Sequence, residues 1–250
     1  YKRTSPNLFP IVGSLKDKKY RYGGREYEMG QHGFIRDMEW SVSRQSGDEI
    51  CFSVESNQET LEKYPFAFAI EIRYALVRRE LKITWNISNR DTKKMYYSFG
   101  GHPCFTCPIH GETDKDGYGY HFHIDGDIRY YGIDLESGLK LPEEHVLKLK
   151  SGRAAFTPDF FTNGAYIITG NQTQKISLYD RSGEDYLTVS FDAPMVGLWS
   201  AEGKNAGYAA IEPWFGRCDD IDFDGTLEER AGGNILDAKE SFSSTYTITV

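Results

Sequence analysis

The chain has 250 residues, of which 39% are hydrophobic and 14% aromatic, and its formal net charge at pH 7 is −8. A chain of this length can bury the core of one full domain, and its acidic balance argues against the basic surface of a nucleic-acid-binding protein. No stretch approaches the roughly 20 apolar residues of a membrane-spanning helix, and no secretory signal begins the sequence. We therefore expect a cytoplasmic protein with neither nucleic acid nor membrane as a partner.

Alternation of apolar and polar residues predicts most of the secondary structure. It recurs, in chain order, at 38–42, 50–54, 66–76, 80–88, 120–124, 176–178, 187–191 and 246–250. In the fourth of these segments Leu81, Ile83, Trp85 and Ile87 share one face. A period of two with one apolar face is typical of half-buried antiparallel strands.

Helical periodicity is scarce, and it predicts at most one short turn at 59–63. The polar stretches 110–119 and 200–207 have the composition of loops, and no Pro/Ser-rich linker or repeat divides the chain. The sequence therefore predicts an all-β protein. Its simplest architecture is two large packed antiparallel sheets in one domain spanning residues 1–250.

The four cysteines do not form the pattern of a disulfide-stabilised domain. Cys104 and Cys107 match a C-x-x-C half-site, but no second cysteine pair with zinc spacing follows. His121 and His123 alternate with apolar residues, which puts both on the polar face of one strand. That spacing can chelate a metal, but it also suits a solvated face, which is the interpretation preferred here.

Two apolar segments each end in one ionisable residue followed by proline. These residues are His102 and Glu212. A proline biases the preceding residue toward extended backbone, so both are expected at strand ends. Phe105 and Trp214 adjoin them, and a histidine and a carboxylate beside aromatic rings are typical of an acid/base pair next to a sugar-stacking surface. Trp199 is interpreted as a wall or core residue.

Four motifs occur in order along the chain. They are Asn-Leu-Phe-Pro-Ile-Val-Gly at 7–13, Gln-His-Gly-Phe-Ile-Arg-Asp at 31–37, Gly-Gly-His-Pro-Cys-Phe at 100–105 and Ile-Glu-Pro-Trp-Phe-Gly at 211–216. Together they resemble the aldose 1-epimerase (galactose mutarotase) superfamily, and within it the LacX-type bacterial branch associated with lactose operons. The resemblance covers essentially the whole chain. It implies a large β-sandwich, the mutarotase-like supersandwich, with an open sugar cleft.

The resemblance also implies roles for individual residues. His102 matches the family's acid and Glu212 its base, and His32 matches a second histidine that contacts the sugar. Arg36 is expected to hold sugar hydroxyls, although it also stands next to an aspartate with which it can form a structural ion pair. Asp159 matches an acidic sugar-binding position, within a weaker motif.

Two features depart from the family pattern. Ser14 stands where relatives carry an arginine that contacts the sugar, which bears on affinity or substrate preference. Relatives also carry additional N-terminal strands, so we expect the domain to lack some of these strands.

The expected activity is interconversion of the α and β anomers of a hexose by acid/base ring opening and closure. This chemistry needs no organic cofactor and no metal. The expected partner is a small-molecule sugar, a hexose or hexose phosphate. The sequence is also compatible with a homodimer. Alternatives on the same fold are a hexose-6-phosphate 1-epimerase and a non-catalytic sugar-binding or regulatory protein. A glycoside hydrolase or lyase would need a second flanking carboxylate.

Overall fold

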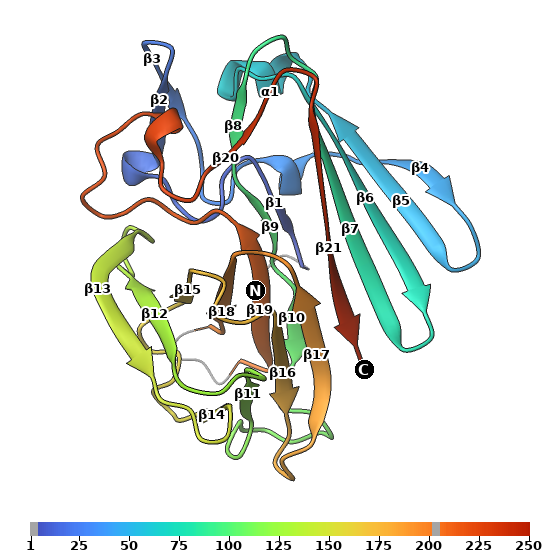
Figure 1. The fold of residues 1–250 in the computed structure, drawn as a ribbon, viewed down its shortest axis with the longest axis vertical. Helices are drawn as coiled ribbons and strands as arrows, with labels where there is room; N and C mark the ends of the chain where they lie inside the picture. Colours follow the sequence, from blue (N-terminus) through green and yellow to red (C-terminus); the bar gives the residue numbers. More distant parts are fainter. Residues whose placement is uncertain (1–4, 202–205) are drawn as a thin grey trace.

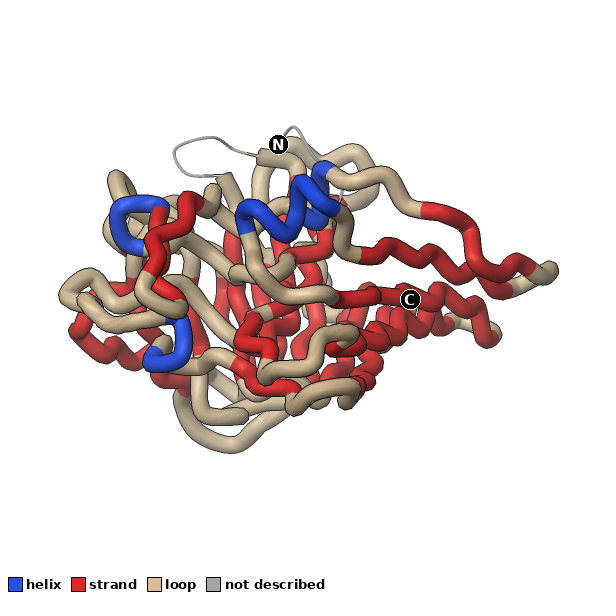
Figure 2. The backbone as a smooth tube through the Cα atoms, turned by 90° about the horizontal axis from the view of Figure 1, so that it is seen from above, coloured by secondary structure: helices blue, strands red, loops and turns tan. Residues whose placement is uncertain are grey.

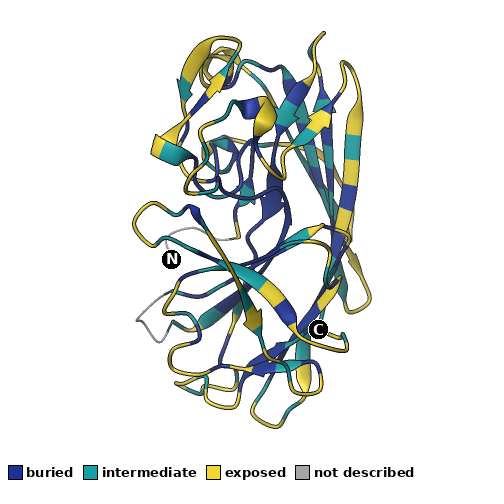
Figure 3. Cartoon of the chain, turned by 60° about the vertical axis from the view of Figure 1, so that its left-hand side comes forward, coloured by how far each residue is buried: buried dark blue, intermediate teal, exposed yellow. Residues whose placement is uncertain are grey.

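The computed structural model describes residues 5–201 and 206–250. In this part of the chain, strands form two large antiparallel sheets that pack face to face, with two small two-stranded sheets beside them (Figure 1). Buried residues gather between the layers, while loops and strand ends are exposed (Figure 3). The predicted all-β sandwich is confirmed.

The first sheet holds eight strands among the described residues. Its hydrogen-bonded order is β1 (Asn7–Leu8), β9 (Phe99–Gly101), β19 (Tyr208–Phe215), β18 (Met195–Trp199), β15 (Tyr166–Ile168), β12 (Ile128–Ile133) and β13 (Lys140–Leu147). β10 (Cys104–Thr106) also pairs with β19. Strand β19 is therefore central, with neighbours on both sides, and all its residues after the first are buried.

The second sheet holds nine strands in the same described ranges. Their order is β14 (Arg153–Ala155), β11 (Gly119–His121), β16 (Lys175–Tyr179), β17 (Asp185–Phe191), β21 (Ser241–Thr249), β7 (Glu80–Asn89), β6 (Phe68–Val77), β5 (Glu49–Glu55) and β4 (Ser41–Gln45). β2 (Lys19–Tyr22) pairs with β3 (Arg25–Glu28), and β8 (Met95–Tyr97) pairs with β20 (Asn234–Leu236).

Helical structure is confined to short pieces, which Figure 2 shows in blue. They are α1 (Gln58–Lys63) and the 3₁₀ turns η1 (Lys16–Lys18), η2 (Ile35–Asp37) and η3 (Leu227–Glu229). Asn57 caps α1 by accepting a hydrogen bond from the Thr60 N–H at 2.9 Å. No described helix has the length or apolar character to cross a membrane, since α1 has six residues.

The alternating segments become strands, with two informative differences. The strand predicted at 38–42 is observed as β4, which begins three residues further along the chain. All side chains of β4 are exposed, so hydrogen bonding to β5, and not burial, determines where this strand begins and ends. Leu76, predicted on the apolar face of β6, is 59% exposed, whereas its neighbour Ala75 is buried. The end of the hairpin formed by β6 and β7 extends past the body of the sandwich (Figure 2). There, alternation of residue types no longer predicts which side chains are buried.

Trp85 of β7 joins the two sheets. Its ring lies 5.2 Å from that of Phe99 on β9, in an edge-to-face arrangement, and 4.7 Å from that of Tyr246 on β21. Its indole Nε1–H donates a hydrogen bond to Asn7 Oδ1 at 3.1 Å. This side chain is 2% exposed, so it contacts the core on every side.

We predict that Trp85→Ala lowers the free energy of unfolding by about 3–5 kcal/mol, because it removes a fully buried aromatic ring and leaves a cavity. Val42, which is 53% exposed, provides the control. Val42→Ala should change the same quantity by no more than about 0.5 kcal/mol. Urea unfolding measures both, and equal losses in the two variants would contradict this account of the core.

Candidate functional site

The central strand β19 supplies two side chains of the site, Glu212 and Trp214. Residues two apart on a strand point to the same face, so carboxyl and indole lie side by side. The register places Glu212 opposite Gly197 of β18, and Trp214 opposite Gly100 of β9. The glycines leave room for the indole: a Cβ on Gly197 would lie 2.2 Å from Trp214 Cζ2, and one on Gly100 would lie 2.7 Å from Trp214 Cδ1. The neighbouring strands thus make the space that this tryptophan fills.

His102 follows β9 directly, and its backbone is held in place when its N–H donates to Pro6 O at 3.0 Å. Its imidazole Nδ1 lies 3.3 Å from Glu212 Oε1, with side-chain exposures of 6% and 2%. The Trp199 ring meets the imidazole edge-on at 5.6 Å and forms a wall of the site, as expected. Two ionisable residues 110 positions apart in sequence therefore form one buried pair.

His32 adds a second imidazole beside this pair, with its ring 5.8 Å from the His102 ring. The Gly13 N–H donates to His32 Nδ1 at 3.1 Å, and the His32 N–H donates to Gly13 O at 2.8 Å. Since Nδ1 accepts a hydrogen bond, the ring proton of neutral His32 is on Nε2. The imidazole can therefore donate a hydrogen bond to a ligand through Nε2.

A cleft of about 550 Å³ surrounds these groups, within the usual size range of small-molecule sites. The sequence-predicted residues that line it are His32, Arg36, His102, Glu212 and Trp214, and Ser14 and Trp199 line it as well. Arg36 Nη2 donates to Gln31 O at 2.7 Å, and the anticipated contact between Arg36 Nε and Asp37 Oδ2 is present at 4.0 Å. The guanidinium is thus held at the cleft wall.

Phe105 and Asp159 are not among the residues that line this cleft. Phe105 lies on β10, opposite Ala209 of β19, and packs against the main core. Asp159 is exposed and borders a different hollow of about 460 Å³. The structure therefore does not bring these two residues to the cleft that His102 and Glu212 line.

Sequence reasoning did not identify the turn between β12 and β13 as part of the site. Ile133 and residues 135–138 of this turn line the cleft, as do Gln31 and Cys218. A Cβ on Gly138 would lie 2.7 Å from Ser14 Oγ, so the turn approaches the serine closely. Gln31 belongs to the motif at 31–37. The turn carries no sequence motif that marks it as part of a site, because only the packing of the first sheet brings it to the cleft.

Burial sets the electrostatics of the site. It lowers the pKa of His102 to about 4 and that of His32 to about 3, and it raises the pKa of Glu212 well above its ordinary value. The Trp214 indole lies close enough to lower the pKa of Glu212 in part, although it falls short of hydrogen-bond geometry. Within the described residues, neither Glu212 Oε2 nor Trp214 Nε1 has a hydrogen-bond partner. These two buried polar atoms are available to ligand hydroxyls.

Cys104 lies next to the pair. Cys104 Sγ lies 3.7 Å from His102 Nδ1, and burial raises the pKa of its thiol to about 12. The thiol therefore stays protonated at neutral pH. All four cysteines are free, which agrees with the absence of a disulfide pattern in the sequence.

Comparison with known proteins shows the family to which this chain belongs. The sequence matches the family model of aldose 1-epimerases over residues 2–249. The chain belongs to the aldose 1-epimerase family. It is 27% identical to the chromosomal protein LacX of Lactococcus lactis subsp. lactis over 98% of this chain and 85% of that protein.

Solved structures agree with the family. The chain is similar to a galactose mutarotase related enzyme from Lactobacillus acidophilus, with a TM-score of 0.89, 32% identity, and coverage of 98% of this chain and 82% of that one. It is also similar to a galactose mutarotase-like protein from Lactobacillus casei, with a TM-score of 0.89, 26% identity, and coverage of 98% and 84%. The resemblance seen in the four motifs thus extends to the whole fold.

The depressed pKa of His32 predicts a pH-dependent stability. An unfolded histidine takes up a proton at about pH 6.5, whereas buried His32 does so only at about 3, so the unfolded state binds more protons between these values. Stability is therefore lost as the pH falls below 6.5. When the pH is lowered from 7 to 5, the parent should lose unfolding free energy because of His32. We predict that His32→Gln lacks this contribution, so its loss over the same interval should be smaller by about 2 kcal/mol.

Urea unfolding of both proteins at the two pH values measures this difference. Glutamine can still accept the hydrogen bond from the Gly13 N–H, so the loop should keep its shape. An equal loss of stability in parent and variant would show that His32 titrates as an ordinary, solvated histidine.

Proposed function

We propose that this protein is an isomerase that interconverts the α and β anomers of a hexose by opening and closing the sugar ring. The observation that carries the proposal is the buried pair of His102 and Glu212, with 3.3 Å between Nδ1 and Oε1 at the wall of the cleft. Membership in the aldose 1-epimerase family and the similarity to mutarotase-related structures support it.

Ring opening requires two coupled proton transfers. The Glu212 carboxylate takes the proton of the C1 hydroxyl while the His102 imidazolium gives a proton to the ring oxygen, and the C1–O5 bond breaks to leave an aldehyde at C1. Rotation about C1–C2 presents the other face of the carbonyl. Closure then runs in reverse, with Glu212 as acid and His102 as base. The pair holds one proton throughout, so the cycle ends where it began.

Burial makes the pair suited to this exchange. In water the ordinary pKa values would leave the shared proton on histidine, because imidazole is more basic than carboxylate by about two pKa units. Burial lowers the pKa of His102 and raises that of Glu212, which reverses this preference and leaves the shared proton on Glu212 in the resting pair. Ring opening therefore begins once that proton has passed across the 3.3 Å contact to His102, and ring closure uses the pair in its resting state.

The remaining cleft residues bind and orient the sugar. The Trp214 and Trp199 rings offer apolar surface for a pyranose face. His32 Nε2–H and the Arg36 guanidinium donate to hydroxyls, and each such contact limits the motion of the ring over the acid/base pair. Ser14 contributes a hydroxyl in place of a charged fork, so hydroxyl recognition rests more on Arg36.

We predict that Glu212→Gln and His102→Asn each lower kcat for α-glucose or α-galactose mutarotation by about 10²–10⁴-fold, because each removes one of the two proton-transfer groups. Polarimetry on freshly dissolved α-sugar measures the rate. Asp159→Asn is the matched control, since this carboxylate is exposed outside the cleft, and it should keep the rate within about twofold of the parent.

Folded Glu212→Gln and His102→Asn variants that match the parent rate would overturn the proposal. Sugar binding by calorimetry without any acceleration in the parent would favour a sugar-binding module on the same fold.

The proposed mechanism also predicts the pH profile. The active form of the free enzyme carries one proton on the pair, and a second proton is added only at a pH well below 6.5, because burial depresses the pKa of His102. We therefore expect kcat/KM to change by less than about twofold between pH 7 and pH 5.5. An ordinary histidine would cause a loss of about tenfold over this interval, and such a loss would contradict the account.

A second candidate substrate has one specific observation in its favour. Lys18 lines the cleft together with Arg36, which provides two cationic side chains near its wall. A hexose 6-phosphate is therefore included in the assay beside the free sugars. Faster turnover of the phosphosugar, with loss of that advantage in Lys18→Gln, would assign it as the substrate.

A further inference from the structure

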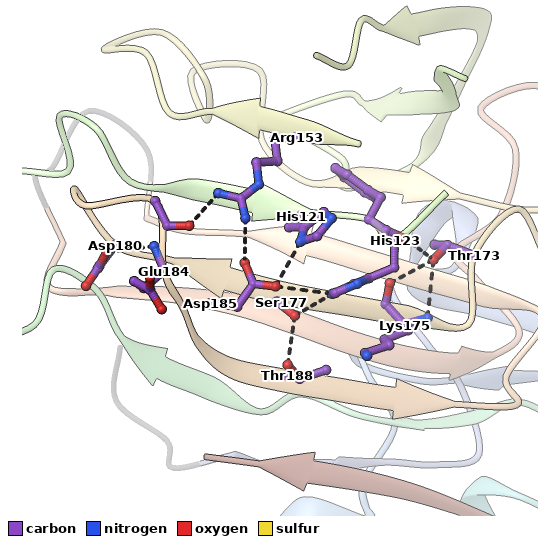
Figure 4. A network of polar contacts seen from close by, with 12 residues as sticks. His121, His123, Arg153, Thr173, Lys175, Ser177, Asp180, Glu184, Asp185 and Thr188 are labelled. Carbon is purple, nitrogen blue, oxygen red and sulfur yellow. Dashed lines mark hydrogen bonds and ion pairs between the residues drawn. The ribbon is translucent and has the colours of Figure 1, made fainter. Parts of the chain in front are cut away.

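A cluster of two histidines and one carboxylate lies on the nine-stranded sheet, apart from the cleft residues of the eight-stranded sheet. His121 ends β11, His123 follows two residues later, and Asp185 begins β17 (Figure 4). Strand β16 lies between these two strands and contributes Ser177 to the same network. Alternation predicts a solvated face for the two histidines, and in the structure both side chains also approach one carboxylate.

The spacing of the donor atoms is that of ligands around a single ion. His121 Nδ1 lies 2.8 Å from Asp185 Oδ2, and His123 Nε2 lies 3.5 Å from the same oxygen. One donor atom from each residue lies within 4.8 Å of the other two. Ligands about 2.0–2.2 Å from a zinc ion at tetrahedral or octahedral angles are separated by about 2.9–3.5 Å, and the two separations between Asp185 Oδ2 and the histidines are close to these values.

The surroundings hold these three side chains in place. The three side chains are 20%, 23% and 24% exposed, so an ion can reach them from solvent. Arg153 Nη2 lies 3.3 Å from Asp185 Oδ1, which leaves Oδ2 to face the histidines. Ser177 Oγ lies 2.7 Å from His123 Nε2, so an ion bound to this nitrogen would replace the contact with the serine hydroxyl. The contact of Arg153 with the other carboxylate oxygen is of the kind that orients a metal ligand from outside.

Glycine makes space beside the first imidazole. A Cβ on Gly152 would lie 3.3 Å from His121 Cδ2 and 3.4 Å from its Nε2. The backbone therefore packs against the Nε2 edge of His121, while Nδ1 is directed to the carboxylate. The rings of the two histidines lie 3.8 Å apart, and their donor nitrogens reach the same oxygen.

We propose that His121, His123 and Asp185 bind a divalent first-row transition-metal ion of the zinc, nickel or copper class. Imidazole nitrogens favour these ions, whereas magnesium and calcium favour sites made of oxygen ligands. The three donors leave further coordination positions to water, and the ion connects β11 to β17 across β16. Binding to the folded chain then raises its melting temperature by mass action.

Calorimetric titration of the chelator-treated, dialysed full chain with zinc sulfate tests the site. We expect one zinc ion per chain, a higher melting temperature with zinc or nickel, and no comparable effect of magnesium chloride. His121→Gln and His123→Gln should each weaken zinc binding by about tenfold or more. The double variant His110→Gln/His145→Gln is the control, because it removes two histidines outside the cluster and should bind as the parent does.

The cleft is the rival location for the ion, since His102 and Cys104 lie close together there. The His102→Asn variant should therefore retain full zinc binding. Paramagnetic resonance of one equivalent of copper(II) on the parent protein gives a readout that does not depend on any variant folding, and we expect coupling to two imidazole nitrogens. No binding, binding that survives loss of both cluster histidines, or binding lost in His102→Asn would each overturn the proposal.

Discussion

An imidazole and a carboxyl held 3.3 Å apart and almost without solvent contact are the constraint on which the rest of the site depends. Neither group is stable there as an isolated charge, because transfer of a charge from water to a protein interior costs several kcal/mol. The same desolvation lowers the pKa of His102 and raises that of Glu212. A pair that holds one proton, and that can pass it across this contact, fits a reaction that runs in both directions.

The fold provides the conditions that keep this pair dry and aligned. Strand β19 is paired on both sides, so Glu212 has little freedom to move toward water. Gly197 and Gly100 admit the Trp214 ring over the neighbouring strands.

Beyond the strand, a buried ion pair supports the loop that bears Ser14. Arg230 Nε donates to Asp219 Oδ1 at 2.6 Å, and the Asp219 N–H donates to Ser14 O at 3.0 Å. The loop that bears Ser14 is thereby joined to the segment that follows the central strand.

The sequence carries much of this information in local form. Alternation predicts β6 and β7, because both strands have one face in the core over most of their length. The proline-terminated motifs mark His102 and Glu212 as candidate site residues, because an ionisable residue in an apolar segment can be recognised without a structure. Local patterns fail where distant segments decide the outcome. Phe105 is close to His102 in sequence, yet it packs against the core from β10.

Tertiary packing explains the other differences. The turn at 135–138 reaches the cleft only because of the order of strands in the first sheet, and it carries no motif. Asp159 matches an acidic sugar-binding position in the sequence, but in the structure it borders a different hollow. For the two histidines of β11 and its extension, alternation predicts the shared face correctly but not the carboxylate of β17 that both approach.

The most direct test of the central claim is the protonation state of His102 itself. Nitrogen-15 NMR of the histidine rings, with the His102 signal assigned through its loss in His102→Asn, follows this group as the pH is lowered. The account predicts a neutral imidazole at pH 7 that titrates with a midpoint well below 6.5, near the value of about 4 that burial imposes. A midpoint at or above 6.5 would mean that the pair is solvated, and it would contradict the account of a shared proton in a dry site.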